Sequence, residues 1–96
     1  MEIFLQDLIE IHQWAVEIEH ILVIQLRPYF LSITVEENPL SLHIIVSSRQ
    51  FDNKSVNERI QLVLDLITYH GSDILKANVI IEPFTAFEIQ DILEHL

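Results

Sequence analysis

The chain has 96 residues, of which 50% are hydrophobic and 21% are charged; these values exclude a disordered segment and fit one globular domain. Fifteen Asp and Glu residues against five Lys and Arg residues give a net charge of -10, which disfavours binding to nucleic acids or anionic membranes. The absence of cysteine excludes disulfides, thiolate metal sites and cysteine nucleophiles, and the single glycine, Gly71, excludes a glycine-rich phosphate loop.

The first 26 residues have the periodicity of a long helix that ends before Pro28. Acidic residues interrupt this segment, so it matches neither a signal peptide nor a membrane span, and we expect a cytoplasmic protein. Steps of three and four residues place six apolar side chains on one stripe, which we expect to face the core: Phe4, Leu8, Ile11, Ala15, Ile18 and Leu22.

Two strands are expected next, at residues 29–36 and 40–47, because apolar and polar side chains alternate in both. The turn residues 37–39 between them predict an antiparallel hairpin.

A capping box at Ser55 and Glu58 predicts a helix that runs to His70 and stops at Gly71. We expect this helix to bury Val56, Ile60, Val63, Leu64 and Ile67. A third strand is expected at residues 75–82, and a second capping box, at Thr85 and Glu88, begins the last helix.

The predicted order is therefore α-β-β-α-β-α, an α+β fold with a three-stranded mixed sheet and helices on one face. The strand–helix–strand unit from residue 40 to 82 predicts a parallel pair, whereas the first hairpin is antiparallel. The other face of the sheet is expected to be partly open and to show Ser32, Thr34, His43, Ile45, Ser47, Lys76, Asn78 and Ile80.

This order, together with a motif after the second strand, resembles the BolA-like family, whose members have a type II KH-like topology. The residues that fit the family pattern are Ser47, Phe51, Asp52, Lys54, Ser55, Arg59, Leu62 and Val63. The resemblance implies a single BolA-like domain over residues 1–96 with an extended N-terminal helix.

The resemblance also implies a function, since BolA-like proteins act as iron-trafficking adaptors that pair with monothiol glutaredoxins and share an iron–sulfur cluster. Their ligands are a Cys or His in the first hairpin loop and a His at the start of the third strand. Here the loop at residues 36–39 has neither, and Lys76 stands near the second position, so no cofactor or metal ligand is expected. The motif glycine of the family is Asn53, and the His of its Arg-His pair is Ile60.

A cationic segment between the second strand and the middle helix is the candidate partner-binding site. Three of the five Lys and Arg residues fall there, and in KH domains the same region contacts a nucleic-acid backbone. We expect a protein partner to contact Arg49, Lys54, Ser55, Arg59 and Lys76. The alternative is a solvated helix cap with salt bridges.

The long first helix is apolar around more of its circumference than one small sheet can cover. A two-fold homodimer would bury the surplus, and its predicted interface consists of Leu5, Ile9, Trp14, Val16, Ile21 and Val23. In the alternative, the helix breaks near residues 17–20 and folds back over the core.

Two other kinds of site, a metal site and a catalytic triad, have weaker support in the sequence. Glu17 and His20 have the spacing of one di-iron ligand pair, but such a site needs a second pair and further carboxylates. No Ser-His-acid grouping is apparent, so an enzyme is the least favoured class. The sequence favours a non-catalytic adaptor, then a homodimeric interaction module, and then a nucleic-acid binder that the charge disfavours.

Overall fold

Three helices and a three-stranded sheet follow one another in the predicted order. The computed structural model describes residues 5–37, 39–71 and 78–96. The elements are α1 (Leu5–Leu26), β1 (Phe30–Glu36), β2 (Ser41–Ser47), the short 3₁₀ helix η1 (Arg49–Phe51), α2 (Val56–His70), β3 (Asn78–Phe84) and α3 (Ala86–Glu94). The α+β fold class and the α-β-β-α-β-α order are thus confirmed, although residues 75–77 of the expected third strand lie outside the described residues.

The sheet has the order β1-β2-β3, so the most apolar strand, β2, lies in the middle. β1 pairs antiparallel with β2, and β3 pairs parallel with it, as the hairpin and crossover predicted. Neighbours such as Ile33, Ile44 and Ile81 share one register row and one face. This alternation gives the sheet one apolar face for the helices to cover.

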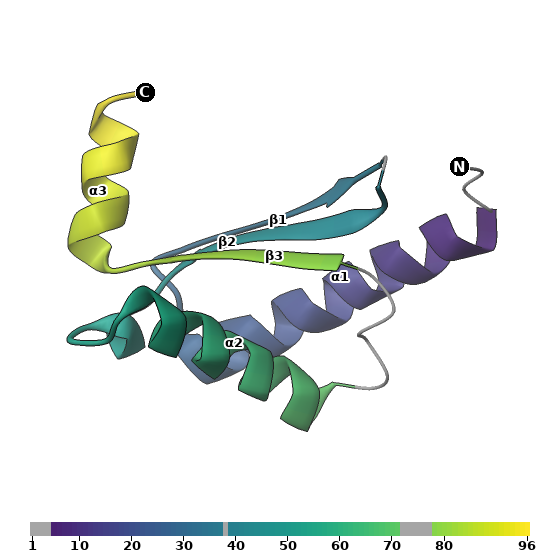
Figure 1. Ribbon diagram of the computed structural model, residues 1–96, viewed down its shortest axis with the longest axis horizontal. Helices are drawn as coiled ribbons and strands as arrows, with labels where there is room; N and C mark the ends of the chain where they lie inside the picture. The colour runs from purple at the N-terminus through teal and green to yellow at the C-terminus, as the bar shows by residue number, and fades with distance from the viewer. Residues whose placement is uncertain (1–4, 38, 72–77) are drawn as a thin grey trace.

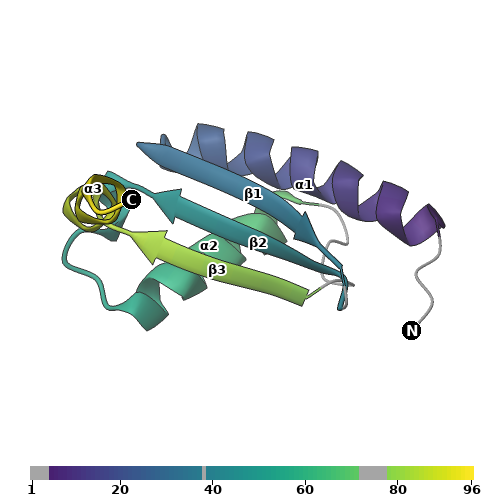
Figure 2. The same cartoon turned by 90° about the horizontal axis from the view of Figure 1, so that it is seen from above.

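Helices α1 and α2 pack side by side on that face, with α1 nearer β1 and α2 nearer β3 (Figures 1 and 2). The predicted stripe of α1 supplies Ile11, Ile18 and Leu22, all fully buried, and α1 continues without a break to Leu26. The alternative of a helix broken near residues 17–20 is therefore wrong.

The buried face of α2 is rotated from the one expected. Its buried side chains are Arg59, Val63 and Ile67, spaced four residues apart, whereas Val56 is 53% exposed. The expectation for Val56 is wrong: its spacing places it in line with this stripe, but it lies in the first turn, where it stays exposed.

Helix α3 does not join α1 and α2 over the core. It begins where β3 ends and rises on the opposite side of the sheet (Figure 1). Only Ile89 of this helix is buried, and Phe87 is 81% exposed. The prediction of helices on one face therefore holds for α1 and α2, and α3 caps one end of the sheet.

The face of the sheet opposite α1 and α2 is exposed to solvent at the end far from α3. Asn78 and Ile80 are exposed there, and His43 and Ile45 are half-buried. Ser47 is fully buried, contrary to expectation, because it lies between Phe30 and Phe84 in one register row at the α3 end.

On the same face, His43 of β2 lies between two carboxylates, those of Glu36 and Glu82. Its two ring nitrogens lie 3.2 Å from a carboxylate oxygen of Glu36 on β1 and 3.3 Å from one of Glu82 on β3. His43 thus lies between carboxylates of the two outer strands, and its Nδ1 forms a hydrogen bond with Glu36. No described helix is both long enough and apolar enough to cross a membrane.

Candidate functional site

The loop that carries the candidate partner-binding residues is fixed to the core at its start. The hydroxyl of Ser48 donates to the carbonyl of Leu26 at 2.8 Å and accepts from the amide of Gln50 at 3.2 Å. Phe51 is fully buried in the core cluster. The loop therefore presents its exposed residues from a rigid base.

Asn53 lies in a turn of this loop and has a positive φ. Its φ of 63° lies in the left-handed region, which favours glycine and admits asparagine more readily than other residues. The family pattern described above has a glycine at this position, and the positive φ here is one that both glycine and asparagine adopt.

The capping box at the start of α2 is confirmed. The Ser55 hydroxyl accepts from the Glu58 amide at 3.2 Å, and the Ser55 amide donates to the Glu58 carboxylate at 3.0 Å. This backbone hydrogen bond from Ser55 lowers the pKa of Glu58, with help from the charge of Lys54. Ser55 is exposed, but its side chain is already engaged in the cap.

Arg59 lies beneath the surface, contrary to the expectation of an accessible partner contact. Its Nε donates to the carbonyl of Lys54 at 2.9 Å, and its Nη1 donates to the carbonyl of Pro83 at 3.4 Å and to Glu88 Oε1 at 2.6 Å. Arg59 thus joins the loop to β3 and α3.

Glu88 completes this junction. The amide of Thr85 donates to the same Oε1 at 2.9 Å, and this hydrogen bond, followed by those from the Thr85 side chain and Arg59, lowers the pKa of Glu88. One carboxylate therefore both caps α3 and holds the buried guanidinium.

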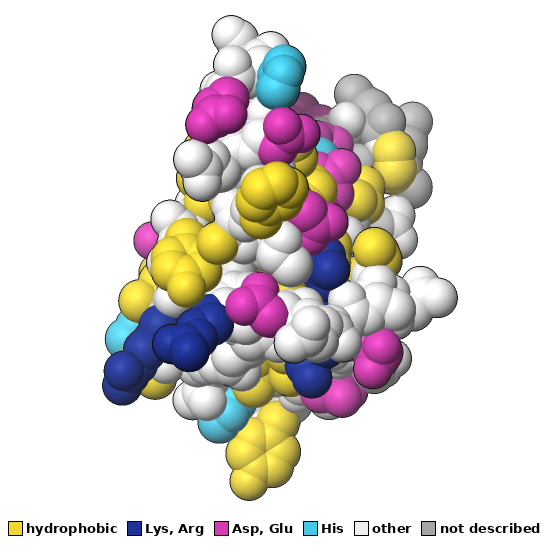
Figure 3. Space-filling model, turned by 90° about the vertical axis from the view of Figure 1, so that its left-hand side faces the viewer, with side chains coloured by type: hydrophobic (Ala, Val, Ile, Leu, Met, Phe, Trp, Pro, Cys, Tyr) yellow, Lys and Arg dark blue, Asp and Glu magenta, His cyan; other side chains and the backbone are white. Residues whose placement is uncertain are grey.

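All Lys and Arg residues within the described ranges lie at one end of the molecule. They are Arg27, Arg49, Lys54 and Arg59, and Figure 3 shows Lys and Arg side chains gathered in the lower half of that end. Lys76 lies outside the described residues. No sequence pattern joins Arg27 to this group, because only the fold brings the end of α1 beside the loop.

Arg27 and Arg49 line a common hollow of about 450 Å³ with Leu26, Tyr29 and Gln50, which we call the Arg27 hollow. Both arginines are exposed, and within the described ranges neither forms an ion pair.

The predicted dimer residues divide into three groups. Ile9, Val16 and Val23 are exposed on the outer face of α1, with Val16 at 68%. Trp14 packs partly buried against the core, and Ile21 is buried within this chain, so Ile21 is not accessible to a second copy. The side chain of Leu5 lies outside the description. Ile24, at 55% exposed, was missed.

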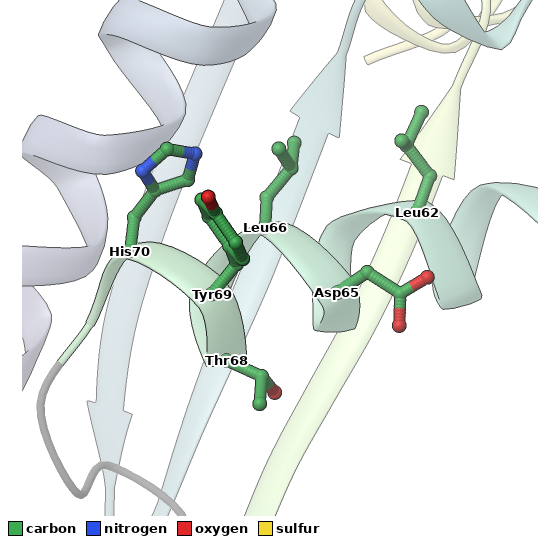
Figure 4. Close-up of a pocket in the computed structure, with 6 residues that line it drawn as sticks. All are labelled: Leu62, Asp65, Leu66, Thr68, Tyr69 and His70. Carbon is green, nitrogen blue, oxygen red and sulfur yellow. The ribbon is translucent and has the colours of Figure 1, made fainter.

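A separate hollow of about 690 Å³ lies along the second half of α2 (Figure 4). It is lined by Leu62, Asp65, Leu66, Thr68, Tyr69 and His70. The rings of Tyr69 and His70 meet edge to face at 4.8 Å. None of the residues predicted for partner binding or dimerisation lines it. Within the described ranges, no three His, Cys, Asp or Glu side chains are grouped as metal ligands.

No model of a known protein family matches the sequence, and no curated protein matches it. Solved structures do match the fold. A Bol-like protein from Babesia bovis superposes with a TM-score of 0.70 at 21% identity, covering 82% of this chain and 92% of its own. The chain has a BolA-like fold.

Two plant structures give the same BolA-like fold. BolA1 from Arabidopsis thaliana has a TM-score of 0.67 at 21% identity and covers 78% of this chain and 94% of its own. The BolA domain of SufE1 from Arabidopsis thaliana has the same TM-score and identity and covers 77% and 93%. The expected resemblance in fold is confirmed.

Proposed function

We propose that this chain is a non-catalytic BolA-like adaptor that acts in the cytoplasm and binds a protein partner through its cationic loop, residues 49–55. The observation that carries this proposal is the concentration of the described cations at one end of a chain with a net charge of -10. Such asymmetry orients an acidic partner surface toward that end and raises the rate of association.

The accessible contacts of this surface are Arg49 and Lys54. Both are exposed, and Phe51 between them anchors the loop. Ser55 and Arg59 support the loop from below, through the helix cap and the Glu88 junction. Lys76 stays a proposed contact from the sequence alone. A monothiol glutaredoxin is the first partner to test, because the family resemblance implies one.

Binding to a tagged monothiol glutaredoxin from the same organism tests the proposal. We expect the native chain to be retained, and the double variant Arg49→Gln/Lys54→Gln to bind at least about tenfold more weakly, because two contacts with the acidic surface are lost. Isothermal titration measures this difference, and the colour of the co-expressed complex reports whether a cluster is shared.

The double variant Gln13→Glu/Thr68→Glu is the control for net charge, since it changes the charge by the same two units at exposed residues of α1 and the last turn of α2, outside the loop. Equal weakening by the control and the loop variant would contradict a localised contact. A chain that stays colourless and unbound removes glutaredoxin as the partner.

A homodimer is the second candidate, and the outer face of α1 favours it. Ile9, Val16 and Val23 are exposed at seven-residue spacing along one uninterrupted helix, the pattern of a helix–helix seam. Two copies packing α1 against α1 would cover this stripe.

Light scattering tests this candidate. We expect a mass twice the 11.3 kDa of one chain, and a return to 11.3 kDa for Val16→Glu, because the charge would lie in the middle of the seam. Val56→Glu, at an exposed apolar residue of α2, is the control and keeps the native mass. A native chain of 11.3 kDa excludes the dimer.

A further inference from the structure

We infer that the Arg27 hollow binds a carboxylate of an acidic peptide segment. The hollow is formed where the end of α1 meets the start of the loop, and Arg27 and Arg49 are both among its lining residues. The assignment of the ligand to a protein partner rests on the proposed function; the anion site itself rests on the geometry described next.

The two arginine-bearing segments are fastened to each other. The side-chain amide of Gln50 donates to the carbonyl of Gln25 at 2.7 Å, and the Ser48 hydroxyl donates to that of Leu26 at 2.8 Å. The amide of Tyr29 donates to the carbonyl of Ser47 at 2.8 Å. A ligand therefore meets a preformed hollow, which lowers the entropic cost of binding.

Arg27 has an unusual backbone for its residue type. Its φ is 45°, in the left-handed region, and its amide donates to the Val23 carbonyl at 3.2 Å as the last bond of α1. Glycine ends helices in this conformation at lower cost, and residues before proline, as here before Pro28, prefer extended backbone. An arginine at this position thus costs stability that glycine would restore, as is common at functional sites.

The two arginines of the hollow form no ion pair with any described residue. Fifteen acidic residues are present in the sequence, yet neither Arg27 nor Arg49 forms an ion pair with a described one. No Asp or Glu lines the hollow, and salt screens negative charges that lie more than about 8 Å away at physiological ionic strength.

The lining favours a peptide carboxylate. Guanidinium forks match the two oxygens of a carboxylate. Leu26 and the half-exposed ring of Tyr29 offer apolar contact to the residues beside it, which a free phosphate ion could not use.

Titration of the ¹⁵N-labelled full chain followed by NMR tests this inference. The probes are a capped tetrapeptide with Asp and Glu between two aromatic residues, its isostere with Asn and Gln, and inorganic phosphate. We expect the acidic peptide to shift the amide signals of Arg27, Tyr29 and Gln50 with a Kd on the order of 1 mM, and the isostere to shift none of them.

The variant Arg27→Gly separates binding from structure. It is expected to keep or raise the melting temperature, because glycine fits the backbone, and to weaken peptide binding about tenfold. Arg49→Gln is expected to weaken binding similarly, whereas Thr68→Glu, which changes the net charge by the same amount but lies on α2 outside the hollow, leaves it unchanged. Unaltered binding in both Arg27→Gly and Arg49→Gln would overturn the inference, as would phosphate binding more tightly than the acidic peptide.

The two proposals fail in different ways. If the chain does not bind glutaredoxin but the acidic peptide still shifts the amide signals, glutaredoxin is excluded as the partner and the carboxylate site in the Arg27 hollow is supported. Absence of peptide shifts in a chain that still binds its partner through Lys54 overturns the hollow alone.

Discussion

Replacing Arg59 with alanine is expected to lower the free energy of unfolding by about 3 kcal/mol. The guanidinium is buried and joins three segments, through the carbonyls of Lys54 and Pro83 and the carboxylate of Glu88. Its removal takes away the donor to the buried carbonyl of Pro83. It also removes the hydrogen bond that joins α2 to Glu88 of α3. Urea unfolding measures the loss.

Two matched variants separate charge from packing. Arg59→Met keeps most of the aliphatic contact and is expected to cost less than alanine. Glu88→Gln keeps an acceptor for Arg59 and, because the Glu88 side chain is 43% exposed, is expected to cost about 1 kcal/mol. If Arg59→Met and Arg59→Ala were both neutral, the junction of Arg59 with Pro83 and Glu88 would not contribute to stability, which would contradict this prediction.

The junction also has a signature in acid. The folded-state pKa of Glu88 lies below its ordinary value of 4.5, because the Thr85 amide and Arg59 favour the ionised carboxylate. The stabilisation is therefore complete above pH 4.5 and is lost as the pH falls through the lowered pKa. As the pH is lowered below 4.5, the free energy of unfolding should fall less steeply for Glu88→Gln than for the native chain. Equal slopes would contradict this role for Glu88.

Periodicity and capping residues were sufficient to predict the order of the elements. The stripe through Ile11, Ile18 and Leu22 identified the core face of α1, and both capping boxes identified helix starts. These signals are local, since each depends on residues within one or two turns, so no knowledge of the packing was needed.

The errors in the candidate site arose where packing overrides residue type. Arg59 is expected at the partner-binding surface because it clusters in sequence with Arg49 and Lys54, whereas its spacing with Val63 and Ile67 places it on the buried stripe of α2. Ser47 was placed on an open face that the fold closes near α3. Both depend on where α3 lies, and the α3 sequence by itself does not determine that.

The Arg27 hollow shows a different limit. Arg27 and Arg49 are 22 residues apart in the sequence and meet only because α1 crosses beneath the sheet to end beside the loop. A positive φ at a non-glycine residue is a property of the folded backbone, so neither the contact nor the strain leaves a local sequence signal.

Replacing Phe51 with alanine is expected to lower the free energy of unfolding by about 3–5 kcal/mol. Phe51 is fully buried between core residues of both helices and the sheet, so its removal leaves a cavity beneath the cationic loop. The loop residues Arg49 and Lys54 flank this anchor. The variant is therefore expected to weaken partner binding even under conditions where the chain stays folded, because the loop loses its fixed position.

Phe87 provides the matched control, since it is the same residue type at 81% exposure. Phe87→Ala is expected to change stability by less than about 0.5 kcal/mol, and Phe51→Leu, which refills most of the cavity, by about 1.5 kcal/mol. Urea midpoints at an unchanged slope give all three values. If Phe51→Ala cost no more than Phe87→Ala, the loop would not be anchored in the core, and the proposed contact surface would lose its rigid base.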